Sequence, residues 1–152
     1  MYFWYTCITV TSFAKMLLKI FAAGQIQIEE HPSSLLLAEY EIGNFSCRAR
    51  CDKSISCFGQ WIVNNETLRV DANSDLTAED ACPRLNTEGR TFLKPSCEVQ
   101  ENEHILRLSV NASKLNNNLV IQCEFQSIIS GHNFNNHPIR STTARVLVLP
   151  SE

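Results

Sequence analysis

The stretch IQCEF, at Ile121–Phe125, alternates apolar and polar side chains around a cysteine. The same alternation surrounds Cys47, where Phe45 and Ala49 share the cysteine's face, and Trp61 lies in a third such stretch, between Cys57 and Val63. A period of two is typical of a β-strand with one buried face. These stretches therefore predict three strands that each point a cysteine or tryptophan into a core.

Working outward, similar patterns predict further strands. They lie at 26–28, 35–38, 67–70, 104–110 and 142–149, with turn residues such as Asn64-Asn65 and Asn116-Asn117-Asn118 between them. His31-Pro32-Ser33-Ser34 splits the first edge strand. Asp71–Cys97 lacks a sustained period; we expect only a helical turn at 76–81 and a short strand at 91–93. The pattern predicts an all-β sandwich.

Composition limits the classes of partner. The chain has 152 residues, enough for one domain, and a formal net charge of −3. Its basic residues form no stripe along the sequence, so we expect no nucleic-acid partner. Seven cysteines indicate a disulfide framework and an oxidising compartment.

The first 24 residues resemble a signal peptide. Residues 1–23 are mostly apolar, and Ala22-Ala23-Gly24 offers small residues for cleavage. Cleavage leaves a domain at 25–150 and removes Cys7, so that six cysteines remain. The alternative is an uncleaved N-terminal signal anchor, which Lys15 and Lys19 make costly within a membrane.

The three core residues carry a family resemblance. From about Gln25 to Leu149 the chain resembles an immunoglobulin-superfamily domain of a divergent, variable-like kind. The resemblance implies an immunoglobulin-like Greek-key β-sandwich in which a disulfide between Cys47 and Cys123 joins the sheets and Trp61 packs against it. Ile121 stands where the family usually has a tyrosine, so the chain is more similar to the divergent domains of secreted and cell-surface proteins.

The other four cysteines allow three pairings. We favour Cys51–Cys57 and Cys82–Cys97, while the alternative joins Cys51 or Cys57 to Cys97. The spacing lacks the close cysteine pairs of a zinc ribbon, so we expect no metal site. An even count after cleavage also leaves no thiol for catalysis.

The sequence offers little support for an enzyme. The four histidines lie apart, although His132 and His137 flank one polar loop, and no phosphate-binding or nucleophile-elbow motif occurs. We expect a non-enzymatic protein without a cofactor. The alternative is a secreted disulfide-rich enzyme or protease inhibitor on a β-scaffold, which needs a reactive loop.

Binding is the remaining function. The loop Ser127–Arg140 is a candidate contact surface, and its central residues are His132, Asn133, Phe134 and Asn135. Sequons at Asn44, Asn65 and Asn111 predict glycans, and a glycan at Asn44 would leave the sheet of Trp61 and Cys123 as the freer face.

We therefore expect a recognition or adhesion module that binds a protein or other cell-surface ligand, or a second copy of itself. It would be secreted or lie on the extracellular face of the plasma membrane. The end at Glu152 fits the N-terminal domain or a fragment of a larger receptor as well as a complete secreted protein.

Overall fold

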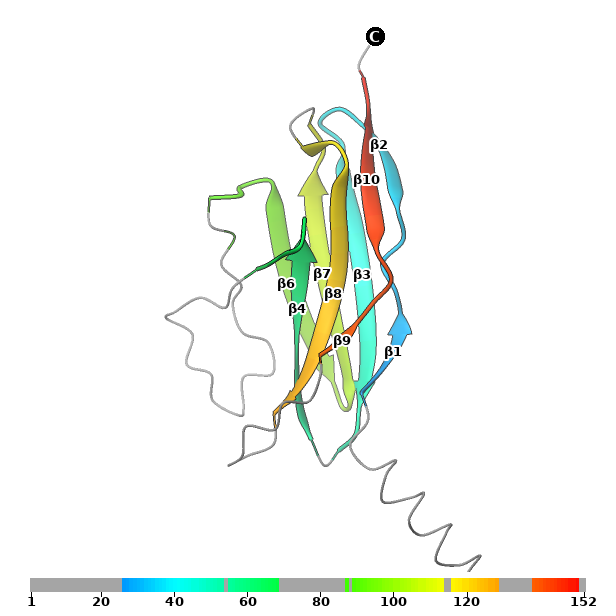
Figure 1. Cartoon of the computed structure of the whole chain (residues 1–152), viewed down its shortest axis with the longest axis vertical. Helices are drawn as coiled ribbons and strands as arrows, with labels where there is room; N and C mark the ends of the chain where they lie inside the picture. The colour runs from blue at the N-terminus through cyan, green and yellow to red at the C-terminus, as the bar shows by residue number, and fades with distance from the viewer. Residues whose placement is uncertain are drawn as a thin grey trace, which may run out of the picture.

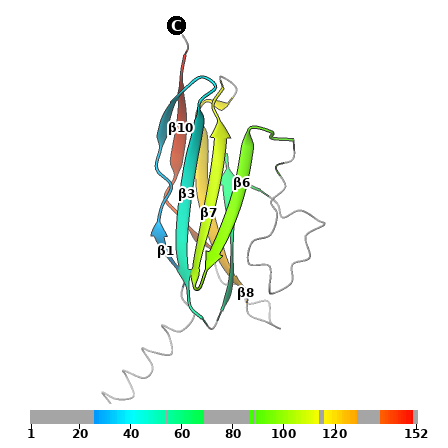
Figure 2. The ribbon, with the colours of Figure 1, turned by 180° about the vertical axis from the view of Figure 1, so that it is seen from behind.

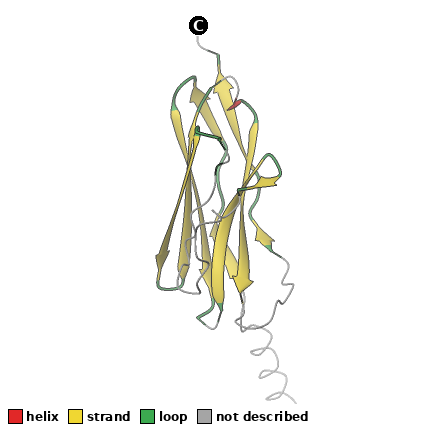
Figure 3. Cartoon of the chain, turned by 90° about the vertical axis from the view of Figure 1, so that its left-hand side faces the viewer, coloured by secondary structure: helices red, strands yellow, loops and turns green. Residues whose placement is uncertain are grey.

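The strands form two sheets that pack face to face. The computed structural model describes residues 26–53, 55–68, 87, 89–113, 116–128 and 138–150. Within this part of the chain the regular elements are all strands of two or more residues. Figure 1 looks onto one sheet, Figure 2 onto the other, and Figure 3 shows both layers from the side. The predicted all-β architecture is confirmed.

The four-stranded sheet is antiparallel throughout. Its order is β1 (Ile26–Glu30), β3 (Ile42–Cys51), β7 (Glu103–Asn111) and β6 (Leu93–Gln100). The central pair, β3 and β7, stays in register from Ile42–Asn111 to Arg50–Glu103.

The six-stranded sheet contains one parallel pair. Its order is β2 (Leu35–Ala38), β10 (Ala144–Leu149), β8 (Leu119–Ile128), β4 (Ser56–Val63) and β5 (Glu66–Thr67), with β9 (Ile139–Arg140) also paired to β8. β2 runs parallel to β10, and the other pairs are antiparallel. The predicted break at residues 31–34 is the point where the chain leaves the first sheet for the second.

The alternating residues face the core as predicted. Trp61 in β4 lies directly across from Cys123 in β8, and both are fully buried. The other large side chains that are fully buried are Phe125, Leu106, Leu108, Ile121, Val63, Val110 and Val146. Burial of such side chains between the sheets is the main stabilising contribution to a sandwich of this kind.

Gly59 permits a close approach between the sheets. A Cβ atom at this position would lie 2.7 Å from Phe125 Cε1 and 2.8 Å from Leu106 Cδ1. These distances are too short for carbon atoms in van der Waals contact. The absence of a side chain in the middle of β4 therefore lets its neighbours fill the core.

Two disulfides are described completely. One joins Cys47 in β3 to Cys123 in β8, with 6.5 Å between the Cα atoms, and the other joins Cys51 to Cys57. Cys97 in β6 is also disulfide-bonded. Its predicted partner, Cys82, lies outside the described residues.

The prediction for Asp71–Cys97 was wrong at its C-terminal end. Instead of a strand at 91–93 within an irregular stretch, β6 runs from Leu93 to Gln100 and pairs with β7 along its whole length. Pro95 is tolerated because β6 is an edge strand, where an N–H group can be missing. The predicted helical turn at 76–81 lies outside the described residues.

Several other boundaries differ from the prediction. The last strand begins at Ala144 rather than at Thr142, and Ile139–Arg140 forms a separate strand, β9. The predicted loop Ser127–Arg140 is therefore shorter, because β8 extends to Ile128. β5 ends at Thr67, while 69–70 lie outside the described residues.

Candidate functional site

The residues at the centre of the predicted binding loop cannot be placed. His132, Asn133, Phe134 and Asn135 lie outside the described residues, as does His137. The other two histidines are far apart in the sequence and on different elements. His31 Nδ1 accepts a hydrogen bond from the Thr142 amide, and His104 is buried in β7.

The three predicted glycan acceptors are exposed. Asn44 and Asn111 lie on β3 and β7 and face outward from the four-stranded sheet, where the Ser109 hydroxyl donates to Asn44 Oδ1 over 2.7 Å. Asn65 lies at the two-residue β4–β5 turn. The positive φ angles of Asn64 and Asn65, 52° and 65°, are those that asparagine tolerates in such hairpins. Exposure of all three side chains is compatible with glycosylation.

A polar row crosses the outer face of the six-stranded sheet. Gln60 in β4 pairs in register with Glu124 in β8, and Glu124 pairs with Arg140 in β9. These positions face outward because their neighbours Trp61 and Cys123 face the core. We refer to Gln60, Glu124, Gln126 and Arg140 as the central polar cluster.

The Glu124 carboxylate organises this cluster. Oε1 accepts hydrogen bonds from Gln60 Nε2 at 2.6 Å and Gln126 Nε2 at 2.8 Å, and Oε2 accepts one from Arg140 Nε at 2.7 Å. Only 3% of the Glu124 side chain is exposed, whereas 56% of the Arg140 side chain is exposed. A buried carboxylate is thus joined to a cation that remains in contact with solvent.

The hydrogen bonds determine the charge state of Glu124. Burial by itself raises the pKa of this carboxyl group, but the hydrogen bonds from Arg140, Gln126 and Gln60, together with the charge of Arg140, outweigh it and leave the pKa below its ordinary value. Glu124 is therefore ionised at neutral pH. The cluster as a whole pairs one buried negative charge with one exposed positive charge.

Apolar side chains lie beside the cluster and at a distant edge of the same sheet face. Phe58 and Ile62 occupy the neighbouring outward positions of β4 and are half-buried and buried, respectively. At the β2–β10 edge, Leu36 and Leu147 are register partners and both are exposed, and Leu149 is also exposed. Apolar groups around a polar centre that contains an arginine are typical of protein contact surfaces.

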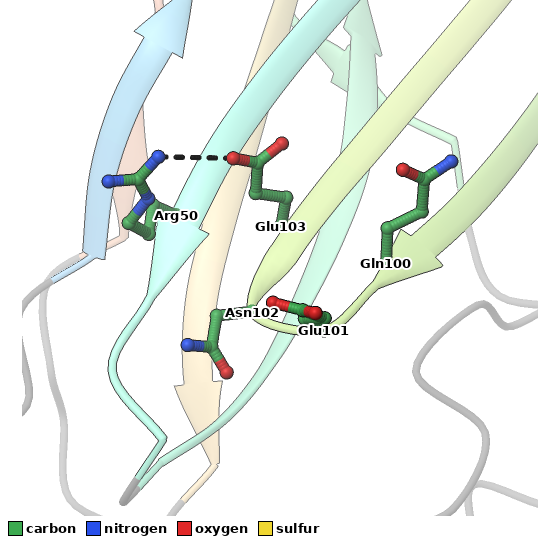
Figure 4. A pocket seen from close by; sticks show the side chains of 5 residues that line it. All are labelled: Arg50, Gln100, Glu101, Asn102 and Glu103. Carbon is green, nitrogen blue, oxygen red and sulfur yellow. Dashed lines mark hydrogen bonds and ion pairs between the residues drawn. The ribbon is translucent and has the colours of Figure 1, made fainter.

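The opposite face of the molecule carries exposed ion pairs. On the four-stranded sheet, Arg48 pairs with Glu30 at 3.2 Å, and Arg50 pairs with Glu29 and Glu103, each at 3.1 Å. A depression of about 430 Å³ lies at the β6–β7 turn, and Figure 4 shows Arg50 and Glu103 joined there. Its other lining residues are Gln100, Glu101 and Asn102. Because Arg50 and Glu103 are already paired with each other, this depression is a weaker candidate than the central polar cluster.

The part of the chain that the structure describes contains no cluster of three or more potential metal ligands. It also contains no helix of the length and apolar character that a membrane span needs. Compared with protein-family models and with curated proteins, the sequence matches none.

The sequence interpretation missed the central polar cluster. It concentrated on the inward residues Trp61 and Cys123 and did not single out their outward neighbours. The dipeptides Gln60-Trp61 and Cys123-Glu124 become a signal only once Trp61 and Cys123 are known to be register partners, because Gln60 and Glu124 then face each other. Arg140 was treated as the end of a loop, and only the pairing of β9 with β8 brings it to Glu124.

Proposed function

We propose that this chain is a non-enzymatic, extracellular immunoglobulin-like module for recognition or adhesion. In this proposal a protein partner contacts the outer face of the six-stranded sheet. The observation that carries the proposal is the Cys47–Cys123 disulfide between β3 and β8, with Trp61 in register with Cys123. An immunoglobulin sandwich places its disulfide and its tryptophan in this relation.

The strand order supports the same assignment. The sheet β1-β3-β7-β6 corresponds to strands A, B, E and D, and β10-β8-β4 corresponds to G, F and C. β5 extends the second sheet beside β4, as the additional strands of variable-type domains do. This correspondence supports the Greek-key topology that the sequence predicts.

The cysteines support an extracellular location. Cys47, Cys51, Cys57, Cys97 and Cys123 are all disulfide-bonded. Such bonds persist in secreted and cell-surface proteins and are rare in the reducing cytosol. The exposed sequons fit the same route, so we assign the chain to the secreted or cell-surface class.

The distribution of sequons favours one face for the partner. Asn44 and Asn111 both face outward from the four-stranded sheet, so glycans at these residues would cover it, whereas Asn65 lies at the β4–β5 turn and not within a strand of the six-stranded sheet. The central polar cluster and its apolar neighbours lie on the other sheet. The outer face of the six-stranded sheet is therefore the better docking surface.

Two single substitutions test this assignment with matched glycans. Arg140→Asn completes an Asn-Ser-Thr acceptor with Ser141 and Thr142, whereas Arg107→Asn completes an Asn-Leu-Ser acceptor on the four-stranded sheet. Each change removes one exposed arginine and adds one glycan, but on opposite faces. Fluorescent tetramers of the secreted chain would be applied to an arrayed library of cell-surface proteins, with glycan occupancy measured by mass spectrometry.

The expected result is saturable binding to one or a few surface proteins. The Arg140→Asn glycan should abolish this binding, and the Arg107→Asn glycan should leave it intact. Binding that survives both glycans would contradict the docking face. Failure of the wild-type tetramer to bind any surface protein, or an enzymatic activity in the secreted chain, would contradict the proposed class.

A further inference from the structure

Arg140 is held so that most of its guanidinium group faces outward. Its Nε atom donates to the buried Glu124 carboxylate at 2.7 Å, which fixes the side chain at one end. The interactions that Arg140 makes with described residues all go through Nε, and none uses Nη1 or Nη2. The group therefore presents the two terminal nitrogens of a planar fork to the exterior.

Both carboxylate oxygens of Glu124 already accept hydrogen bonds, so they do not engage the terminal nitrogens of Arg140. The Oε1 atom accepts from Gln60 and Gln126, and Oε2 is bonded to Arg140 Nε. The carboxylate thus holds the guanidinium in place without engaging the terminal nitrogens. A planar guanidinium whose two terminal nitrogens bond to no described residue matches the geometry of a carboxylate, which it can bind through two parallel hydrogen bonds.

The charge of the surrounding face points to an acidic ligand. Arg140 and Arg145 are the cations that the described strands place on the outer side of the six-stranded sheet, and both are exposed. Glu124 is the one carboxylate in an outward strand position there, and it is buried. Arg140 is bonded to its carboxylate partner through Nε, whereas Arg48, Arg50 and Arg107 on the other sheet each use a terminal nitrogen for theirs.

We propose that Arg140 recognises an acidic side chain, aspartate or glutamate, of a protein partner that docks on this face. Glu124 acts as a positioning residue for it. The inference rests on the proposed function and specifies the chemistry of its partner. The apolar side chains of β4 next to the cluster, the half-buried Phe58 and the buried Ile62, favour a protein surface as the source of the carboxylate.

The test uses a library of random dodecapeptides displayed on phage and selected on the immobilised, full-length secreted chain. We expect the enriched peptides to share an aspartate or glutamate. Their affinity should fall by about tenfold or more when Arg140 is replaced by glutamine, because a charge-assisted pair is lost. Replacing the shared acid of the peptide by its amide should have the same effect, and the two changes together should cost little more than either alone.

Arg107→Gln is the matched control. Arg107 is exposed to a similar extent, 51%, but it pairs with Glu98 on the opposite face, so its loss should leave the peptide affinity unchanged. Arg140→Lys keeps the charge but loses the planar fork, and it should weaken binding nearly as much as Arg140→Gln. Thermal melting of each variant would establish that it is folded.

Three outcomes would overturn the inference. They are enriched peptides without an acidic residue, equal binding by the wild type and Arg140→Gln, and an equal loss in Arg107→Gln. These outcomes are distinct from failure of the proposed function. If the Arg140→Asn glycan blocks a cell-surface partner while Arg140→Gln binds that partner normally, the docking face stands and the role of Arg140 is wrong.

Discussion

The two outer faces of the sandwich use the same residue types in different physical settings. On the four-stranded sheet, the pair Arg50–Glu103 spans neighbouring strands at 3.1 Å, with both side chains substantially exposed. On the six-stranded sheet, the pair Arg140–Glu124 is 2.7 Å long, and the carboxylate is almost entirely buried. Solvent screens the first pair, whereas the second needs additional hydrogen bonds to offset the desolvation of Glu124.

This contrast explains why only one face is a candidate for recognition. Exposed cross-strand ion pairs satisfy both partners, contribute little stability and leave no directed group for a ligand. A buried carboxylate with three donors holds its arginine in a defined direction. Preorganisation of this kind lowers the cost of ordering side chains when a partner binds.

The largest expected effect is a difference in stability between variants of the two carboxylates, Glu124 and Glu103. Glu124→Gln leaves one acceptor oxygen for three donors, so at least one donor loses its partner; we expect a loss of about 1.5–3 kcal/mol in the free energy of unfolding. Glu103→Gln on the other face should cost about 0–1 kcal/mol. Urea denaturation of both variants measures the difference. Equal losses would show that burial does not distinguish the two faces.

The sequence predicted the side chains that face the core better than those that face outward from the sheets. Alternation identified Cys47, Trp61 and Cys123 as core residues because an apolar face repeats with period two along each strand. β6 was missed although Leu93, Pro95, Cys97 and Val99 alternate with polar residues, because a proline inside the run argues against a strand unless that strand lies at a sheet edge.

The central polar cluster could not be predicted in the same way. Gln60 and Glu124 are 64 residues apart, and only the register of β4 with β8 brings them together. Alternation within one strand assigns faces but does not fix the register between two strands. Arg140 required in addition that a short strand form within a predicted loop.

A smaller effect concerns the loss of stability at acidic pH. It should show whether this loss comes from the interior or from the charged outer faces. His104 lies in β7, the strand whose outer side carries Glu103, but its own side chain faces the core between the register partners Ala49 and Val99. Burial lowers the pKa of His104 below its ordinary value of 6.5. The folded state therefore binds a proton less readily than the unfolded chain. The stability contributed by neutral His104 is fully present above pH 6.5 and is lost as the pH falls below it.

The variant His104→Leu isolates this contribution. We expect wild-type stability, measured by urea denaturation, to decline as the pH falls from 6.5 towards 4.5, the ordinary carboxyl pKa near which Glu124 begins to contribute. The variant should show a flatter profile in this range. An unchanged decline would assign the acid sensitivity to the charged outer faces instead of the interior.

The smallest expected effect concerns the turn beside the depression on the four-stranded sheet. Glu101 has a φ angle of 52°, in the left-handed region where a side chain is strained and glycine is not. Glu101→Gly should therefore raise the free energy of unfolding by about 0.5–1 kcal/mol, the relief of strain exceeding the entropy that glycine adds to the unfolded chain.

Asn118→Gly supplies the control, because asparagine already tolerates its φ angle of 63°, and we expect a change within about 0.5 kcal/mol. A loss of stability in Glu101→Gly would mean that the glutamate side chain makes a stabilising contact at the depression. That result would mean that the four-stranded sheet also holds a polar side chain in a fixed position. The two outer faces would then differ less in how well their polar groups are ordered.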